Sequence, residues 1–252
     1  MSALVTALLL CSAEPPHAAQ LTLNQQLIAA SYKRDVANVV TCLRRGADAS
    51  ARFGIENDAA GTFRDAWDGG EVVFGLESWT PLIALASSNP LPDPPPGSGE
   101  VWKNSARCAE LKQKIPREQI EKRREDGMIV LYTLLSHNCK LDLDDGNGAT
   151  ALCQAVENEN LPIARTLLDF GANPNVRVRT TIDGPGGVTP LHAACGSKEL
   201  LKLLLGHGAD ASVKDDEGQT PADWVKLDAH RSFDLIRDSN GWRILERSGK
   251  KQ

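Results

Sequence analysis

Residues 187–210 read GVTPLHAACGSKELLKLLLGHGAD, and this stretch decides the fold. Thr189 can cap a helix with its hydroxyl, and Pro190 then stands at the first helical position, where its missing N–H is harmless. At the other end, Gly208 can take the left-handed conformation that stops a helix. The leucines between them repeat at helical spacing. The stretch therefore predicts two short helices joined by a turn at Gly196–Ser197.

Related copies of this pattern occur elsewhere in the chain. Clear ones lie at 148–173 and 218–222, and looser ones begin near Leu27 and Thr80. Helices of about ten residues cannot bury their apolar faces alone, but stacked copies can. The copies therefore predict a stack of helix pairs in which each pair contacts only its neighbours.

The spacing of the copies is uneven because extra residues separate them. These extra residues fall within 52–78, 87–127 and 177–187, which are rich in glycine, proline or aspartate. Such residues favour turns and loops. The irregular spacing is thus explained by insertions in loops.

The recurring motif G-x-T-P-L-H-x-A, followed by L-L-x-x-G-A-D, resembles the ankyrin repeat. The resemblance is clear over 147–222 and looser elsewhere. It implies an all-α ankyrin-repeat solenoid of about five helix-turn-helix units, with β-hairpin finger insertions and one helical insertion. We expect the domain to span 20–240, with units at 23–51, 79–143 (interrupted by the insertion 87–127), 147–176, 186–214 and 217–238.

The last unit departs from the motif, because it lacks the closing Gly-Ala-Asp. Such an end unit is typical of a cap on a solenoid. We expect a helical cap whose inward face carries Trp224, Leu227, Phe233 and Ile236. We expect residues 241–252 to form a frayed tail.

Two insertions are predicted to form fingers that bind a partner. The first, 52–78, alternates in the way of a short hairpin and is rich in aromatic residues, which are common in binding hot spots. The second, 177–184, places two arginines on one face of a strand. The candidate partner-binding residues are Phe63, Arg64, Trp67, Phe74, Arg177 and Arg179. The alternative is that the aromatic residues fold the first finger onto the stack and the arginines stay solvated.

The central insertion begins with a proline-rich spacer at 87–99. Residues 100–114 are then expected to form a helix, which ends at Pro116. A second helix is expected over 117–137, with a charged front half and an apolar rear half.

The residues that could support chemistry have simpler structural interpretations. His192, Cys153 and Cys195 lie close enough in the repeat pattern for a metal or a Cys/His pair, but a buried histidine and small buried cysteines are the better interpretation. Asp142, Asp144 and Asp145 resemble the start of a calcium loop, but Gly146 and Cys153 stand at its fifth and twelfth positions, so we interpret the segment as a solvated turn. The sequence predicts no catalytic, cofactor-binding or metal-binding residue.

Composition narrows the class of protein further. The chain has 252 residues, a net charge of −5 and 41% hydrophobic residues, so it can bury a core and has no overall basic surface for nucleic acid. No apolar run is long enough to span a bilayer. The run at 3–11 predicts a signal peptide over 1–19 and a secreted or periplasmic protein, with a cytoplasmic protein as the alternative. The six cysteines form no recognisable disulfide framework.

The resemblance implies a function as well as a fold. We expect a non-catalytic scaffold that binds another protein through its fingers and its concave inner-helix face, and we expect a monomer without a cofactor. Two alternatives remain open. One is an enzyme or metal-dependent hydrolase that uses the inserted segments, and the other is an intracellular adaptor or effector whose leader is not cleaved.

Overall fold

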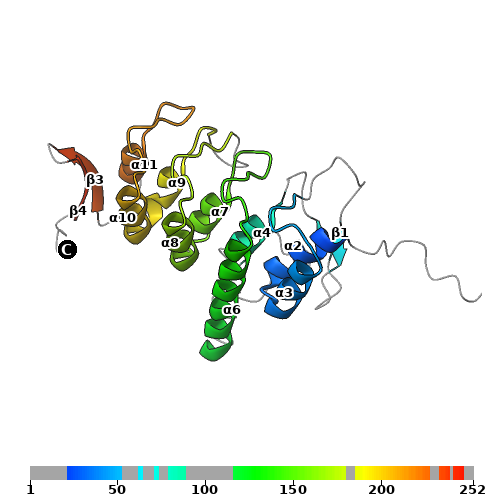
Figure 1. Ribbon diagram of the computed structural model, residues 1–252. Helices are drawn as coiled ribbons and strands as arrows, with labels where there is room; N and C mark the ends of the chain where they lie inside the picture. Colours follow the sequence, from blue (N-terminus) through cyan, green and yellow to red (C-terminus); the bar gives the residue numbers. More distant parts are fainter. Residues whose placement is uncertain are drawn as a thin grey trace, which may run out of the picture.

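The computed structural model describes residues 22–52, 62–64, 71–73, 79–88, 116–179, 185–227, 233–238 and 241–246. For the strands at 62–64 and 71–73 it describes the backbone alone. These segments form an elongated stack of short helices, with a β-hairpin at the C-terminal end (Figure 1). The chain is thus a helical solenoid.

Most helices come in pairs that follow one another along the chain. The pairs are α2 (Leu23–Lys33) with α3 (Val36–Arg44), α4 (Pro81–Ser87) with α6 (Arg117–Ser136), α7 (Ala151–Glu157) with α8 (Leu161–Asp169), and α9 (Pro190–Ala193) with α10 (Lys198–Gly206). A short 3₁₀ turn, η2 (Ala194–Gly196), joins the last pair, and α11 (Pro221–Leu227) follows. The predicted turn near Gly196 is confirmed.

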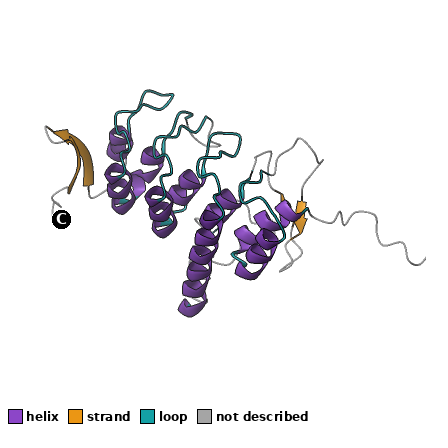
Figure 2. Cartoon of the chain, in the orientation of Figure 1, coloured by secondary structure: helices purple, strands orange, loops and turns teal. Residues whose placement is uncertain are grey.

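Contacts between the helices define two rows. The inner helices α2, α4, α7, α9 and α11 each contact the next in that order, and α3, α6, α8 and α10 form a parallel outer row. Loops that join one pair to the next gather along one edge of the stack (Figure 2). Each pair therefore buries its apolar face against its neighbours, as the repeat pattern predicts.

Helix ends follow the predicted chemistry in most units. The hydroxyl of Thr80 accepts a hydrogen bond from a backbone N–H in the first turn of α4. After the outer helices, Gly46, Gly171 and Gly208 have φ values of 92°, 93° and 83°, and Asn138 has 53°. These left-handed conformations stop each outer helix, so the stop predicted at Gly208 is confirmed and the other outer helices end in the same way.

Thr150 differs from the predicted cap. Its hydroxyl makes no capping hydrogen bond and instead lies 3.6 Å from the sulfur of Cys153. Cys153 lies one helical turn further along and is buried, so its sulfur is within reach of this hydroxyl as an acceptor. The prediction of a side-chain cap was wrong at this position.

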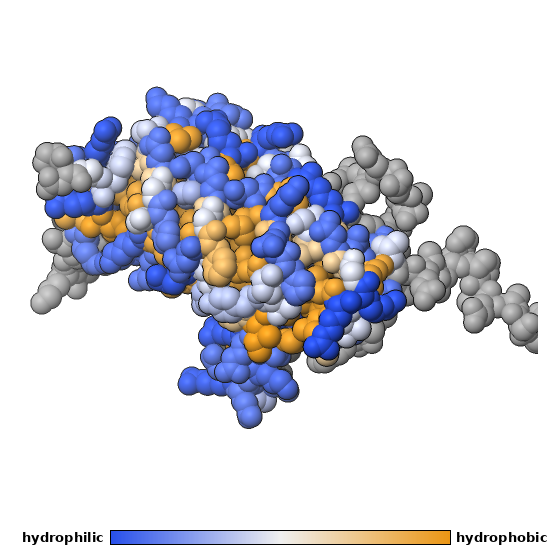
Figure 3. Space-filling model, viewed as in Figure 1, coloured by the Kyte–Doolittle hydropathy of each residue, from blue (hydrophilic) through white to orange (hydrophobic). Residues whose placement is uncertain are grey.

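Helix α6 is the longest described helix, and its two halves differ. Val130, Leu131 and Leu134 in its rear half are fully buried in the core. Its front half is mostly exposed and extends past the neighbouring helices (Figure 1). This free end is hydrophilic in the space-filling view (Figure 3). The predicted helix over 117–137 is confirmed, while the helix expected over 100–114 lies outside the described residues.

The first finger contains the predicted hairpin. Strand β1 (Thr62–Arg64) pairs antiparallel with β2 (Glu71–Val73), with Phe63 opposite Val72. This pairing confirms that the backbone of the first finger forms the predicted short hairpin.

The C-terminal part differs from the prediction. Strand β3 (Phe233–Asp238) pairs antiparallel with β4 (Gly241–Glu246), and the two strands contact α11 and α10 respectively. Along β3, Phe233 and Leu235 are buried while Ile236 is half-buried, which is the period of a strand. The helical cap over 233–238 and the frayed tail over 241–246 were therefore wrong predictions.

No helix in the part of the chain that the structure describes is long and apolar enough to cross a membrane.

Candidate functional site

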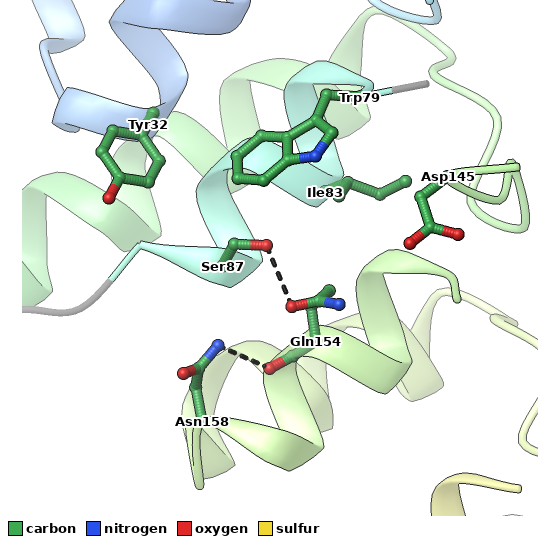
Figure 4. A pocket seen from close by; sticks show the side chains of 7 residues that line it. All are labelled: Tyr32, Trp79, Ile83, Ser87, Asp145, Gln154 and Asn158. Carbon is green, nitrogen blue, oxygen red and sulfur yellow. Dashed lines mark hydrogen bonds between the residues drawn. The ribbon is translucent and has the colours of Figure 1, made fainter. Parts of the chain in front are cut away.

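A cavity of about 270 Å³ lies among the inner helices α2, α4 and α7 (Figure 4). Its walls combine aromatic, amide, hydroxyl and carboxylate groups, a mixture suited to holding a polar ligand group. The lining residues are Tyr32, Trp79, Ile83, Ser87, Asp145, Gln154 and Asn158.

Hydrogen bonds between α4 and α7 hold the amide side of this cavity. Ser87 donates from its hydroxyl to the Oε1 atom of Gln154 over 3.1 Å. Asn158, one helical turn after Gln154, donates from Nδ2 to the backbone oxygen of Gln154 over 2.9 Å and to that of Ala86 over 3.4 Å. These bonds fix both amides, so the carbonyl oxygen of Asn158 remains an acceptor at the cavity.

Two aromatic side chains form the opposite wall. The rings of Tyr32 and Trp79 have centroids 6.1 Å apart and planes inclined at 51°. Tyr32 comes from the end of α2, and Trp79 directly precedes the cap of α4. Both side chains are half-buried, so part of each ring faces the cavity.

Asp145 supplies the charge of the cavity. Its Oδ1 atom accepts hydrogen bonds from the backbone N–H groups of Asn147, over 2.9 Å, and Ala149, over 3.1 Å. The residue is only 5% exposed. The sequence predicted a solvated turn here, and this was wrong for Asp145, because the turn folds back on its carboxylate.

Asp144, the preceding residue, is engaged in a different way. Its Oδ1 atom accepts from the N–H of Gly146 over 2.8 Å and lies 3.8 Å from the guanidinium of Arg52. Within the described ranges, no group of three or more His, Cys, Asp or Glu side chains could hold a metal ion.

His192 is part of the hydrogen-bonded structure. Its Nε2 atom lies 3.2 Å from the backbone oxygen of Gln219, which can only accept, so Nε2 carries the proton. Its Nδ1 atom accepts from the backbone N–H of Thr189 over 3.2 Å. Burial lowers the pKa of His192, which keeps the ring neutral. The imidazole thus ties two successive inter-repeat turns together.

The cysteines proposed as partners of His192 are buried thiols. Burial raises the pKa of Cys153 to about 11, which keeps its thiol protonated. The sulfur of Cys195 lies 3.1 Å from the backbone oxygen of Pro221 and 3.5 Å from that of Leu191, and it can donate to both. These contacts explain both thiols as parts of the core.

The predicted finger residues have different outcomes. The backbones of Phe63 and Arg64 lie in β1, whereas Trp67 and Phe74 lie outside the described residues. Arg177 and Arg179 are exposed on either side of buried Val178, which forms an isolated β-bridge with Val188.

Arg177 also has a partner within the chain. Its Nη2 atom lies 3.3 Å from the Oδ1 atom of Asp216. Both side chains are exposed, so this ion pair is weak and open to exchange.

Sequence reasoning missed the cavity among the inner helices. One signal could have pointed to it, because Trp79 occupies the position before the Thr of the motif. The other units carry Ala149, Val188 or Gln219 there. Trp79 lines the cavity, so this unusual aromatic residue marks the unit that contains it.

Comparison with protein families agrees with this two-row arrangement. The model for ankyrin repeats, in three copies, matches residues 124–215. Residues 124–215 are thus similar to three ankyrin repeats. The match covers most of α6 and all of α7 to α10, so the helix pairs of the ankyrin-repeat segment are those seen in the structure.

Three curated relatives show what this chain is similar to. It is 39% identical over 111 residues to ankyrin repeat and SOCS box protein 11 of Danio rerio. It is 36% identical over 125 residues to the E3 ubiquitin-protein ligase KEG of Arabidopsis thaliana. It is 31% identical over 102 residues to protein phosphatase 1 regulatory subunit 27 of Mus musculus.

These matches cover 43%, 48% and 40% of the chain. They span only 34%, 7% and 62% of the respective relatives. The similarity therefore concerns the repeats and leaves the rest of each relative unmatched.

Proposed function

We propose that the protein is a non-catalytic scaffold that binds another protein through its inner helices and hairpin fingers. The observation that carries this proposal is the cavity on the inner row, where aromatic rings and a buried carboxylate meet. Ankyrin repeats generally serve as protein-binding modules. Such a cavity suits one anchoring side chain of a partner.

The groups that could support catalysis have structural partners. His192 is held by two turns, and the thiol of Cys153 stays protonated because burial raises its pKa to about 11. A general base or nucleophile needs an accessible group with a matched pKa. The proposed role of this surface is therefore to bind a partner rather than to catalyse a reaction.

The names of the relatives support the same proposal. The mouse relative is a regulatory subunit of a phosphatase, which by name acts on another protein. Another relative is named as a ubiquitin ligase, but the match spans 7% of it. For this chain we extend only the role of a binding module.

The proposal includes five repeat units, with the last one reduced to α11. It also includes partner contacts from both fingers, where the candidates are Phe63, Arg64, Trp67, Phe74, Arg177 and Arg179. Residues 1–19 would act as a signal peptide and direct the protein outside the cytoplasm. The protein would act as a monomer. Sequencing the mature N-terminus tests the localisation.

Site-specific photo-crosslinking tests the binding face. A photoreactive residue replaces Asn158, the C-cap of inner helix α7, in one variant, and exposed Lys202 on outer helix α10 in a matched control. A third variant carries it at Phe63 in the first finger. After irradiation in the native compartment, we expect the same partner protein on Asn158 and Phe63, and little on Lys202.

Equal labelling of the inner and outer positions would contradict the proposal, because it would mean random collisions or an outer-face partner. Crosslinks at Asn158 without crosslinks at Phe63 would limit binding to the inner helices. Thermal melting of each variant checks that the fold is retained.

A further inference from the structure

We propose that the cavity of Tyr32, Trp79, Asp145, Gln154 and Asn158 binds the guanidinium of an arginine side chain on the partner protein. This inference rests on the proposed function, since it names the chemistry of the partner at the same face. It follows from the unequal partners of two equivalent carboxylates in the stack.

Asp145 and Asp215 occupy the same place in two turns of related geometry, one before α7 and the other before α11. The N–H of Asp145 donates to Ala149 O over 3.0 Å, and the N–H of Asp215 donates to Gln219 O over 2.9 Å. In each turn, the Oδ1 atom accepts two backbone N–H groups, which at Asp215 come from Glu217 and Gln219. The two carboxylates are thus held alike on one side.

Their second oxygens differ. The Oδ2 atom of Asp215 accepts a hydrogen bond from the indole Nε1 of Trp224 over 2.8 Å. Gln154 stands at the equivalent position after Asp145, but its Oε1 atom is turned to the hydroxyl of Ser87. No described residue donates to the Oδ2 atom of Asp145, and the carboxylate lines the cavity (Figure 4).

Asp145 is 5% exposed as a residue, and a carboxylate in such a place favours a charged donor as its partner. Asp144 beside it has Arg52 at 3.8 Å, whereas Asp145 forms no ion pair with any described residue. The missing donor in the turn of Asp145 is therefore supplied by the ligand, in the place where Trp224 supplies it at Asp215.

The other walls select arginine among the cationic side chains. The planar guanidinium can stack on the faces of Tyr32 and Trp79, which attract a cation through the ring electrons. It also carries several N–H donors, so a guanidinium stacked in this way can still donate to the carboxylate of Asp145. A lysine ammonium would use the carboxylate but lose the stacking.

The test uses N-acetyl-arginine amide as the probe on the full chain. Nitrogen–proton spectra follow the side-chain amides of Gln154 and Asn158 and the indole of Trp79 during titration. We expect saturable shifts of these signals with a dissociation constant of about 1–10 mM, a range reasonable for a single anchoring residue. The citrulline analogue has nearly the same shape without the charge, and the lysine analogue has the charge without the plane, so both should bind several-fold more weakly.

Two substitutions locate the site. Asp145→Asn should weaken arginine binding roughly 10-fold or more, because it removes the charged acceptor, and Asp144→Asn is the matched control with little effect. Gln154→Trp places an indole where Trp224 stands in the last turn. We expect it to donate to Asp145, keep the fold stable and abolish arginine binding.

The inference is overturned if the arginine and citrulline probes bind equally, if neither binds, or if Gln154→Trp binds arginine normally. Failure here with crosslinking still specific to Asn158 leaves the proposed function standing. Arginine binding with crosslinks spread equally over Asn158 and Lys202 overturns the proposed function instead.

Discussion

Replacing Arg34 with methionine should lower the free energy of unfolding by about 3 kcal/mol. Arg34 is 4% exposed, and its guanidinium joins three helices. Its Nε and Nη2 atoms donate to the hydroxyl and backbone oxygen of Ser88 over 2.9 and 2.8 Å, and Nη1 donates to the backbone oxygen of Arg123 over 3.0 Å. Hydrogen bonds from a charged group contribute about 1.5–3 kcal/mol each, and relief from burying the charge offsets part of the loss.

Gly127 makes this prediction more specific. A Cβ atom there would lie 3.2 Å from three atoms of the Arg34 guanidinium, which the hydrogen bonds hold in place. Gly127→Ala should therefore destabilise the natural protein by about 1 kcal/mol, since crowding outweighs the gain in helix propensity. In the Arg34→Met background the clash is relieved, and the same substitution should stabilise by about 1 kcal/mol.

Urea unfolding of the four proteins, followed by far-ultraviolet circular dichroism, measures this cycle. The comparison is valid if the dependence of unfolding free energy on urea stays the same in all four. An equal effect of Gly127→Ala in both backgrounds would refute the clamp, because it would show that the guanidinium moves aside without cost.

Three further predictions concern pH, reactivity and the C-terminal hairpin. Burial lowers the pKa of His192 from 6.5, so the unfolded state binds the proton more readily and the stability of the fold falls as the pH drops below about 6.5. His192→Gln should flatten this fall, as measured by urea titrations at several pH values. An unchanged dependence of stability on pH would contradict the prediction. With its pKa raised to about 11, Cys153 should react with iodoacetamide at about pH 8 only after unfolding, which peptide mass spectrometry detects; rapid labelling of the native protein would disagree. Leu235→Ala should cost about 2–5 kcal/mol because this side chain is 2% exposed, whereas Leu245→Ala, 54% exposed, should change the melting temperature little; the reverse order would mean that the hairpin packs by its other face.

Much of the fold could be predicted because each repeat carries its own local signals. Thr80 before Pro81 starts a helix, and Gly171 or Gly208 stops one, through backbone preferences that need no knowledge of neighbours. The leucines that pack the helices repeat at helical spacing, so the faces that meet could be read as well.

The C-terminal hairpin was missed for a reason that lies in the repeat pattern. The end unit was expected to continue as a helix, although residues 233–238 and 241–246 alternate in burial like strands. Asn240-Gly241, at the start of the second run, is a strong hairpin signal in the sequence. Local strand signals here outweigh the helical expectation carried over from the preceding units.

The cavity could not be predicted from one copy of the motif, because it arises from differences between repeats. Asp145 and Asp215 are alike in sequence and in turn geometry, yet one carboxylate is closed by Trp224 and the other is not. The difference comes from the residue nine positions later and from Ser87, which reaches Gln154 from the preceding repeat. A repeat can therefore keep its turn intact and still become a binding site, because the neighbour decides whether the second carboxylate oxygen is satisfied within the chain. If that is the origin of specificity here, exchanging the residues at 154 and 224 should move arginine binding from one turn to the other, provided that an aromatic wall is supplied beside Asp215.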